Sequence, residues 1–564
     1  MAVTIPPLLK DLQDQGLITD DEFTFLLKDF QTRSSDVLTS LLSIDLMNED
    51  EVIPFIAKSL NIQWINLKEF KFNTSLPSEV PAKIAYHYSF VPLSLEKNVL
   101  EIAFYNPKDL ATIDEIQTVI ARRVKAKLAG RKDIREALKK FFGIGADTVQ
   151  DMMDKSDDKT DISDKGTDEN IENLSEDASI IKFVNQVIAE AVKERATDIH
   201  VEPYENELKI RYRIDGILYD APFPTTIKHF HSPIISRFKI MSSLNISERR
   251  MPQDGRFMVK LKSKELDLRI SILPTPWGEA ASIRILSGAS EFLELKDIGL
   301  NANELNKIND AISRPYGMVL VTGPTGSGKT TTLYASLMRL NTRDRKIITI
   351  EDPIEYLMTN ITQIQINPTI NFTFATGLRS MLRHDPDVMM VGEIRDHETA
   401  EIAIQAALTG HLVFSTLHTN DAASTITRMI DIGVEHFLLA SSLQCVVAQR
   451  LLRVLCNECK AKQILVPEVK NGLMNFPEDC NEVYISRGCN KCNFTGFYGR
   501  IGIFEVITID DQLRDLIQRR ASIEEIKKYT ITCGTISLRQ NGFYKVQDGI
   551  TSLEEVLRVT ADNF

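Results

Sequence analysis

The residues with the clearest chemistry lie in segment 319–332, which reads VLVTGPTGSGKTTT. An apolar run breaks there into Gly323-x-x-x-x-Gly328-Lys329-Thr330, which matches the P-loop pattern at every required position. Glycines permit the backbone turns that direct consecutive N–H groups at phosphate oxygens, and the following helix would direct its positive N-terminal end at the same anion. The alternative is a glycine loop that merely joins a strand to a helix, and so restrictive a spacing disfavours it. The sequence therefore predicts a nucleotide site.

The P-loop pattern also assigns individual contacts. Lys329 would lie between the β- and γ-phosphates of ATP, and the Thr330 hydroxyl would be a ligand of Mg²⁺. The candidate nucleotide-binding residues are Gly323, Pro324, Thr325, Gly326, Ser327, Gly328, Lys329, Thr330 and Thr331.

Two acidic segments follow the P-loop, and hydrolysis requires groups that hold the metal and activate water. Residues 346–355 read KIITIEDPIE, an apolar strand that reaches its first carboxylate at Glu351, and residues 387–393 read DVMMVGE and end at Glu393. Because ligands gather at the carboxyl ends of parallel strands, both clusters are expected to face the γ-phosphate. Either segment alone is equally consistent with solvated loop acids. Two acid-tipped strands in one P-loop domain favour a role with Mg²⁺ and water.

Two histidines and two arginines are further candidates. His411 and His418 bracket a third apolar strand in TGHLVFSTLHT, where they could sense phosphate. A single histidine is more often structural, and the spacing alone assigns neither a role. Arg379 and Arg383 are four residues apart and would share one face of a helix, for which an ordinary charged surface is the alternative.

Four of the seven cysteines form two pairs with metal-ligand spacing. The pairs are Cys456-x-x-Cys459 and Cys489-x-x-Cys492, with 29 residues between them. Four thiolates in two such turns make a closed tetrahedral site, the coordination that suits structural Zn²⁺. Redox dithiols are the alternative, but two pairs so close together rarely serve redox chemistry. We therefore predict a zinc site that shapes a small insert (456–492) and takes no part in catalysis.

Length and charge limit the possible functions. The chain has 564 residues, enough for three or four domains at about 150 residues each. A net charge of −12 and a pI near 5.4 argue against wide nucleic-acid contact and so disfavour a DNA translocase. No window of about 18 apolar residues appears, and the N-terminus lacks the basic-then-apolar order of a signal peptide. We expect a cytoplasmic protein without a membrane span.

The pattern of apolar residues divides the chain into five parts. These are a helical hairpin repeat at 1–60, an α+β docking domain at 61–145, an acidic flexible linker at 146–177, a second α+β domain at 178–290 and the P-loop domain at 291–564. The linker is dense in Asp, Lys, Ser and Thr and cannot bury enough apolar surface to offset the entropy of ordering. Strand–helix alternation in the last part predicts an α/β domain with a mostly parallel sheet.

The first 60 residues contain a weak repeat with a period of 29. LITDDEF at 17–23 returns as LMNEDEV at 46–52. In each copy a capping residue, Thr19 or Asn48, stands three positions before a glutamate, which is the capping-box spacing. Two helical hairpins are the simplest interpretation, and two unrelated helices that share cap chemistry are the alternative.

These motifs together resemble a known family. GPTGSGKTTTLY, ITIEDPIEY, LRHDPDVMMVGEIRD and TGHLVFSTLHTND are similar to the Walker A, aspartate, Walker B and histidine boxes of the secretion ATPases of type II secretion and type IV pili. RYRIDG and RRMPQDGR resemble the N-terminal ATPase subdomain of that family. The resemblance implies a RecA-like P-loop domain, a preceding α+β (PAS-like) subdomain, and an N-terminal helical plus α+β domain for regulation or docking.

The resemblance also implies roles and partners. It implies a homo-hexamer with ATP and Mg²⁺ at the subunit interfaces, Glu351 as the water-activating acid, Glu393 as the Walker B acid, and His411 and His418 as sensors. The arginine sensors that it implies are Arg211, Arg213, Arg379 and Arg383. Force would reach an inner-membrane platform protein, with which the cytoplasmic ring would associate peripherally.

Two features place the chain within the family. The tetracysteine insert resembles the assembly branch, whose members extend type IV pili or drive type II secretion, whereas retraction ATPases lack it. The closing run at 538–558 is also similar to that branch, and it predicts a capping box of Thr551 and Glu554. We therefore predict a pilus-assembly ATPase, with a type II secretion ATPase or a non-hydrolysing nucleotide-gated adaptor as alternatives.

One departure concerns regulation. Members of the family that bind cyclic di-GMP usually carry Arg-Leu-Gly at the start of each helical hairpin. The equivalent positions read Pro6-Pro7-Leu8 and Ser35-Asp36-Val37. We therefore do not expect this chain to bind cyclic di-GMP.

Overall fold

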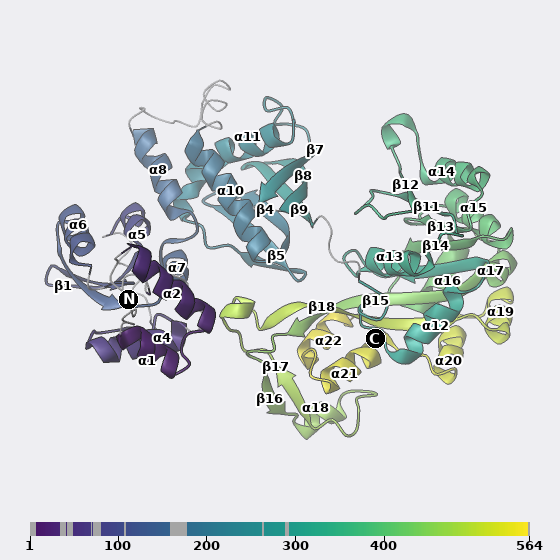
Figure 1. The fold of residues 1–564 in the computed structure, drawn as a ribbon. Coiled ribbons are helices and arrows are strands. Elements are labelled where there is room, and N and C mark those ends of the chain that lie inside the picture. The colour runs from purple at the N-terminus through teal and green to yellow at the C-terminus, as the bar shows by residue number, and fades with distance from the viewer. Residues whose placement is uncertain are drawn as a thin grey trace. The chain divides into compact units, whose positions relative to one another are not determined.

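The computed structural model falls into two compact units, Met1–Leu286 and Ser287–Phe564, which are described separately (Figure 1). The residues that it describes are 7–33, 41, 49–68, 70, 80–106, 109–157, 177–261, 264–287 and 293–561. Within these ranges no helix is both long and apolar enough to cross a membrane.

The described residues at the start of the first unit include the helices α1 (Pro7–Asp14), α2 (Asp20–Arg33) and α4 (Glu49–Leu60). The predicted capping box at Thr19 is confirmed, because Thr19 N donates to Glu22 Oε2 over 2.8 Å and Glu22 N donates to Thr19 Oγ1 over 3.2 Å. The equivalent Asn48 lies outside the described residues, as do Pro6 and the Ser35–Val37 segment.

A small α+β module follows these helices. Its elements are α5 (Ala82–Tyr88), β1 (Phe90–Glu96), β2 (Val99–Phe104), α6 (Leu110–Ile120), β3 (Arg123–Leu128) and α7 (Arg131–Phe142). Strand β1 pairs antiparallel with β2, and β2 pairs parallel with β3. This confirms the mixed pattern expected after residue 60. Strand β3 is not among the predicted elements, although basic and apolar residues alternate along it as they do in a half-buried strand.

The expectation of a flexible linker from residue 146 is wrong at its beginning. Residues Ala146–Asp157 form helix α8. Val149 and Met152, three positions apart, are buried in the same hydrophobic core as α10 (Ala178–Lys193). One apolar stripe is enough to anchor a helix whose remaining surface is charged. Residues 158–176 of the predicted linker lie outside the described residues.

The second half of this unit is the expected α+β domain. Its sheet has the order β6-β5-β4-β9-β8-β7. The strands are β4 (Ala196–Pro203), β5 (Leu208–Ile214), β6 (Ile217–Asp220), β7 (Gln253–Leu261), β8 (Lys264–Thr275) and β9 (Gly278–Ser287), and helices η2 (Thr225–Phe230) and α11 (His231–Met241) lie between β6 and β7. Alternating burial along β4 and β5 packs one face of the sheet against α10.

The second unit is built on a sheet of order β12-β11-β13-β14-β10-β15-β18. Its strands are β10 (Gly317–Thr322), β11 (Ile347–Glu351), β12 (Thr362–Gln365), β13 (Val388–Val391), β14 (Leu412–Leu417), β15 (Leu443–Leu455) and β18 (Phe497–Thr508). All neighbours are parallel except β15 and β18, which form an antiparallel pair. Separate hydrophobic cores cover the two faces, which confirms the α/β prediction.

Helices fill both layers around this sheet. They are α12 (Ala302–Ile312), α13 (Lys329–Leu340), η3 (Pro368–Ile370), α14 (Phe374–Met381), η4 (Leu382–His384), α15 (His397–Leu408), α16 (Ala422–Asp431), α17 (His436–Ser442), α19 (Asp511–Gln518), α20 (Ile523–Thr532), α21 (Leu538–Gln547) and α22 (Leu553–Val559). The predicted capping box at Thr551 is displaced by one residue, since Ser552 is the N-cap of α22 and accepts from Glu555 N. Thr551 instead donates its hydroxyl to Arg453 O.

The insert between β15 and β18 is a small separate layer. It contains β16 (Ala461–Ile464), α18 (Pro467–Asn471), β17 (Glu482–Ile485) and η5 (Asn490–Cys492). Strands β16 and β17 pair antiparallel and share no hydrogen bonds with the main sheet.

Candidate nucleotide site and cysteine cluster

The P-loop joins β10 to α13 at one edge of the sheet. Thr322, the last residue of β10, pairs with Leu417 of the parallel strand β14, so the P-loop and His418 leave the sheet at the same edge. Gly323 has φ 151°, and a Cβ there would lie 2.5 Å from Gln449 O. Only glycine fits this close approach to β15, which places the loop directly against that strand.

Lys329 is the first residue of α13 and folds back over the loop. Its Nζ donates to Gly323 O over 2.8 Å and to Pro324 O over 3.1 Å. Burial lowers the pKa of Lys329 to about 8, the charge of Glu393 opposes that shift, and the charge of Arg450 adds to it. An anionic partner stabilises the charged form of a buried ammonium group, and a nucleotide phosphate would be such a partner.

Glu393 and His418 meet beside this lysine. Glu393 forms an ion pair with Arg395, and His418 Nε2 lies 3.5 Å from Glu393 Oε2. Burial and then the charge of Lys329 lower the pKa of His418, so its imidazole is neutral at pH 7. The structure therefore brings together three predicted site residues, Lys329, Glu393 and His418.

Glu351 does not have the surroundings of a water-activating acid. Its carboxylate accepts hydrogen bonds from Tyr334 Oη, from Thr349 Oγ1 over 2.5 Å and from Gln363 Nε2 over 3.1 Å. The residue is 3 % exposed, and its burial raises the pKa of the carboxyl. A general base must reach a water molecule, whereas this carboxylate is enclosed by three donors. The acids that follow it, Asp352 and Glu355, are more accessible.

His411 and His418 lie at opposite ends of β14. His411 precedes β14, its Nδ1 is 3.0 Å from Ala406 O, and its own carbonyl accepts from Gly317 N at the start of β10. The six residues of β14 separate the two histidines by roughly 20 Å at about 3.3 Å per residue. Within one subunit, the two histidines therefore cannot contact the same phosphate.

The four predicted arginine sensors are engaged in contacts within their own units. Arg211 pairs with Glu202 over 2.5 Å, and the Arg213 guanidinium is 3.8 Å from Asp198, both in the first unit. Arg379 pairs with Glu398 over 2.7 Å, and Arg383 donates to Arg379 O over 3.0 Å. Their predicted action across a subunit interface stays a prediction.

Two residues that the sequence analysis does not identify also border the P-loop. Gln449 and Arg450 are consecutive in β15 and are 2 % and 9 % exposed. Thr332 Oγ1 donates to Gln449 Oε1 over 2.7 Å, and Arg450 donates to Asn420 O over 2.9 Å. Their sequence signal is two adjacent long polar side chains in a largely apolar strand, and burying such side chains is costly unless both are hydrogen-bonded.

The four predicted zinc ligands converge in the insert. Their sulfur atoms all lie within 4.8 Å of one another, with 3.7 Å between Cys456 and Cys489 and 3.8 Å between Cys459 and Cys492. A tetrahedral zinc site with Zn–S bonds of about 2.3 Å has S···S edges of about 3.8 Å. Gly488 N and Gly496 N donate to the sulfurs of Cys459 and Cys492. The donor set, spacing and backbone contacts fit Zn²⁺.

The fold and the site together define a P-loop ATPase, with a parallel sheet, a P-loop lysine and an acid just after β13, which is separated from the P-loop strand β10 by β14 alone. The chain belongs to the type II/IV secretion system protein family, whose model matches residues 173–558. Residues 60–148 match the model of the MshEN domain.

Individual relatives extend this assignment. The chain is 40 % identical over 554 residues to the type IV pilus assembly ATPase PilB of Myxococcus xanthus, covering 97 % of each chain. It is 41 % identical over 491 residues to the type II secretion system protein E of Pseudomonas aeruginosa, covering 86 % of this chain and 97 % of the relative. The Legionella pneumophila ATPase DotB shares the fold, with a TM-score of 0.50, 22 % identity, and coverage of 67 % of this chain and 95 % of DotB.

Proposed function

We propose that this chain is the motor ATPase of type IV pilus assembly. The observation that carries the proposal is the match to the pilus assembly ATPase of M. xanthus over 97 % of both chains, which includes the N-terminal modules. The type II secretion relative from P. aeruginosa covers 86 % of this chain. Similarity that extends through the docking modules favours a common partner as well as a common reaction.

The proposed mechanism assigns a role to each group of the site. The P-loop N–H groups and Lys329 bind the phosphates of ATP. Thr330 and Glu393 would hold Mg²⁺, which when bound would neutralise charge that develops as the γ-phosphoryl group is transferred to water. His418 senses the γ-phosphate beside Lys329. We infer that Glu355 activates water, because this acid, four residues after Glu351, is partly accessible whereas Glu351 is enclosed.

Assembly and location are part of the same proposal. The chain forms a cytoplasmic homo-hexamer in which Arg211, Arg213, Arg379 or Arg383 of one subunit acts on nucleotide held by the next. The ring binds an inner-membrane platform protein of the PilC/GspF kind and thus associates peripherally with the membrane. Zn²⁺ on Cys456, Cys459, Cys489 and Cys492 fixes the insert. Molar mass in solution, measured by light scattering with a non-hydrolysable ATP analogue, tests the hexamer.

The cellular role is tested by deleting the gene in its own host. Loss of surface pili and of twitching, restored by the wild-type gene and not by a Glu393→Gln copy, is the expected result. Retained pili together with loss of secreted enzymes would instead assign the chain to type II secretion, the second candidate. The observation that supports this second candidate is the 41 % identity to the P. aeruginosa secretion protein over 97 % of its length.

Phosphate-release assays on the purified protein distinguish a motor from a non-hydrolysing adaptor. We expect ATP-dependent phosphate release that falls at least about 100-fold in Glu393→Gln, while ATP binding persists. Wild-type protein that binds ATP without releasing phosphate above the Glu393→Gln level would support the adaptor. ATPase activity that rises on addition of DNA would support a DNA-pumping motor.

A further inference from the structure

Residues His418–Asp421 form the loop after β14, which we name the histidine loop. The backbone of this loop is hydrogen-bonded to the side chain of a residue next to the P-loop. Thr419 N donates to Thr322 Oγ1 over 2.9 Å, and the two threonine hydroxyls are 2.7 Å apart. Because Thr322 immediately precedes Gly323, the histidine loop and the P-loop share one anchoring side chain.

Arg450 provides a second attachment, on the β15 side. Its guanidinium donates to Asn420 O over 2.9 Å and to Gln449 O over 3.0 Å. One of its terminal nitrogens lies 3.2 Å from the position that a Cβ on Gly323 would occupy. The guanidinium therefore fills the space between the first P-loop glycine and the histidine loop, and a shorter side chain would leave that space empty.

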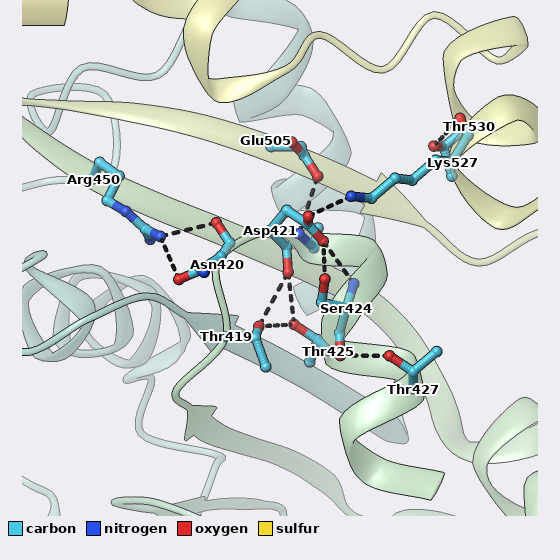
Figure 2. A network of polar contacts seen from close by, with 11 residues as sticks. Thr419, Asn420, Asp421, Ser424, Thr425, Thr427, Arg450, Glu505, Lys527 and Thr530 are labelled. Atoms are coloured by element: carbon cyan, nitrogen blue, oxygen red, sulfur yellow. Dashed lines mark hydrogen bonds and ion pairs between the residues drawn. The ribbon is translucent and has the colours of Figure 1, made fainter. Parts of the chain in front are cut away.

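Lys527 provides a third attachment, from the C-terminal helices. Figure 2 shows Lys527 of α20 reaching Asp421, next to the residue that Arg450 holds. Lys527 Nζ is 2.7 Å from Asp421 Oδ2, while Asp421 Oδ1 accepts from Ser424 N over 2.7 Å and caps α16. Glu505 of β18 accepts from Ala422 N in the same cluster. The Asp421 carboxylate thus joins α20 to the histidine loop.

We propose that Arg450 and Lys527 are positioning residues for ATP hydrolysis, which hold the histidine loop against the P-loop and so place His418 beside Lys329 and Glu393. This inference rests on the proposed role of His418. It adds that α20, in the C-terminal helices, is linked to the nucleotide site through Asp421. Displacement of α20 by a docked partner would move Asp421 and change the turnover rate, with little effect on the P-loop contacts to the phosphates.

The test is steady-state ATP hydrolysis by the purified full-length chain. Lys527→Met and Arg450→Gln are expected to lower kcat about five-fold or more and to change KM less than about two-fold, because small misplacement of a site residue affects the transition state most. Lys527→Arg, which keeps the ion pair, should restore kcat. Lys528→Met, at the next and exposed position of α20, is the matched control and should behave as wild type.

A second variant keeps the test valid if Lys527→Met folds poorly. Asp421→Asn removes the charge but retains a good N-cap residue, so α16 should remain intact while kcat falls as in Lys527→Met. Wild-type kcat in both variants overturns the inference. His418→Ala is measured in parallel. A fall in kcat for His418→Ala alone overturns only the positioning inference, whereas wild-type kcat for His418→Ala overturns the proposed role of His418 and the inference with it.

Discussion

Tyr334, four residues after Thr330 on α13, donates its hydroxyl proton to Oε2 of Glu351 at the end of β11. The same hydroxyl accepts from Glu355 N over 3.4 Å. Tyr334 therefore ties the helix that starts at the P-loop to the acidic segment after β11. Burial and the charge of Glu351 raise the pKa of this tyrosine well above its usual range, so it remains a donor at every physiological pH.

This relationship predicts different outcomes for the two glutamates. Glu355→Gln should lower kcat at least about 100-fold, the size expected for loss of a general base. Glu351→Gln keeps an oxygen that accepts from Tyr334, so its kcat should stay within about ten-fold of wild type. Single-turnover phosphate release measures both, with Asp352→Asn as the comparison. The opposite ranking would make Glu351 the water-activating acid.

Substitutions of the two histidines should have different effects on ATP hydrolysis. His418→Ala should lower kcat about ten-fold or more, because His418 lies beside Glu393. His411→Ala should reduce hydrolysis by an isolated subunit far less, since its ring bonds the end of α15 at the opposite edge. A diluted, monomeric preparation isolates this intrasubunit effect. Equal losses there would contradict the strand geometry.

The cysteine cluster predicts one zinc per chain. Elemental analysis should give that stoichiometry, and Cys456→Ser with Cys489→Ser should abolish it. Loss of the metal should lower the midpoint of thermal unfolding by several degrees, because a structural zinc site stabilises the fold that it closes. Nucleotide affinity should change less than about two-fold, since the P-loop lies outside the insert. Loss of nucleotide binding on zinc removal would assign the insert a direct role at the site.

Glu505 predicts an unusual dependence of stability on pH. Burial raises its pKa from 4.5 to about 7, the charge of Asp421 adds to the shift, and Lys527 and the N–H of Ala422 oppose it. The folded state then holds a proton that the unfolded state has lost. The contribution of Glu505 is therefore fully present below about pH 4.5 and is lost as the pH rises to about 7, in total by roughly 3 kcal/mol.

Glu505→Gln tests this expectation. Glutamine keeps the oxygen that accepts from Ala422 N but carries no proton equilibrium. The variant should gain stability relative to wild type as the pH rises from 5 to 7.5, measured by the midpoint of thermal unfolding. Glu482→Gln, on the exposed end of β17, is the control and should show no such trend. A constant difference between Glu505→Gln and wild type across this range would refute the assignment.

Residue order was enough to predict the P-loop, the acid-tipped strand at Glu393, the cysteine set and the α/β class of the second unit. The P-loop, the acid-tipped strand and each cysteine pair are short patterns of fixed spacing, and the α/β class follows from the alternation of strand and helix patterns, so residue order carries this information directly. The same holds for the capping box at Thr19, in which both partners lie within one helical turn.

How residues from distant strands meet could be seen only in the folded chain. Parallel pairing of β10 with β14 places His418 at the nucleotide edge and His411 at the other, and pairing of β10 with β15 brings Arg450 to Gly323. Glu351 is enclosed because Tyr334 and Gln363 approach from α13 and β12. Helix α8 is not predicted from composition, because its few core-facing residues, Val149 and Met152 among them, stand among charged residues. Burial and partner choice depend on long-range packing, which local residue order does not encode.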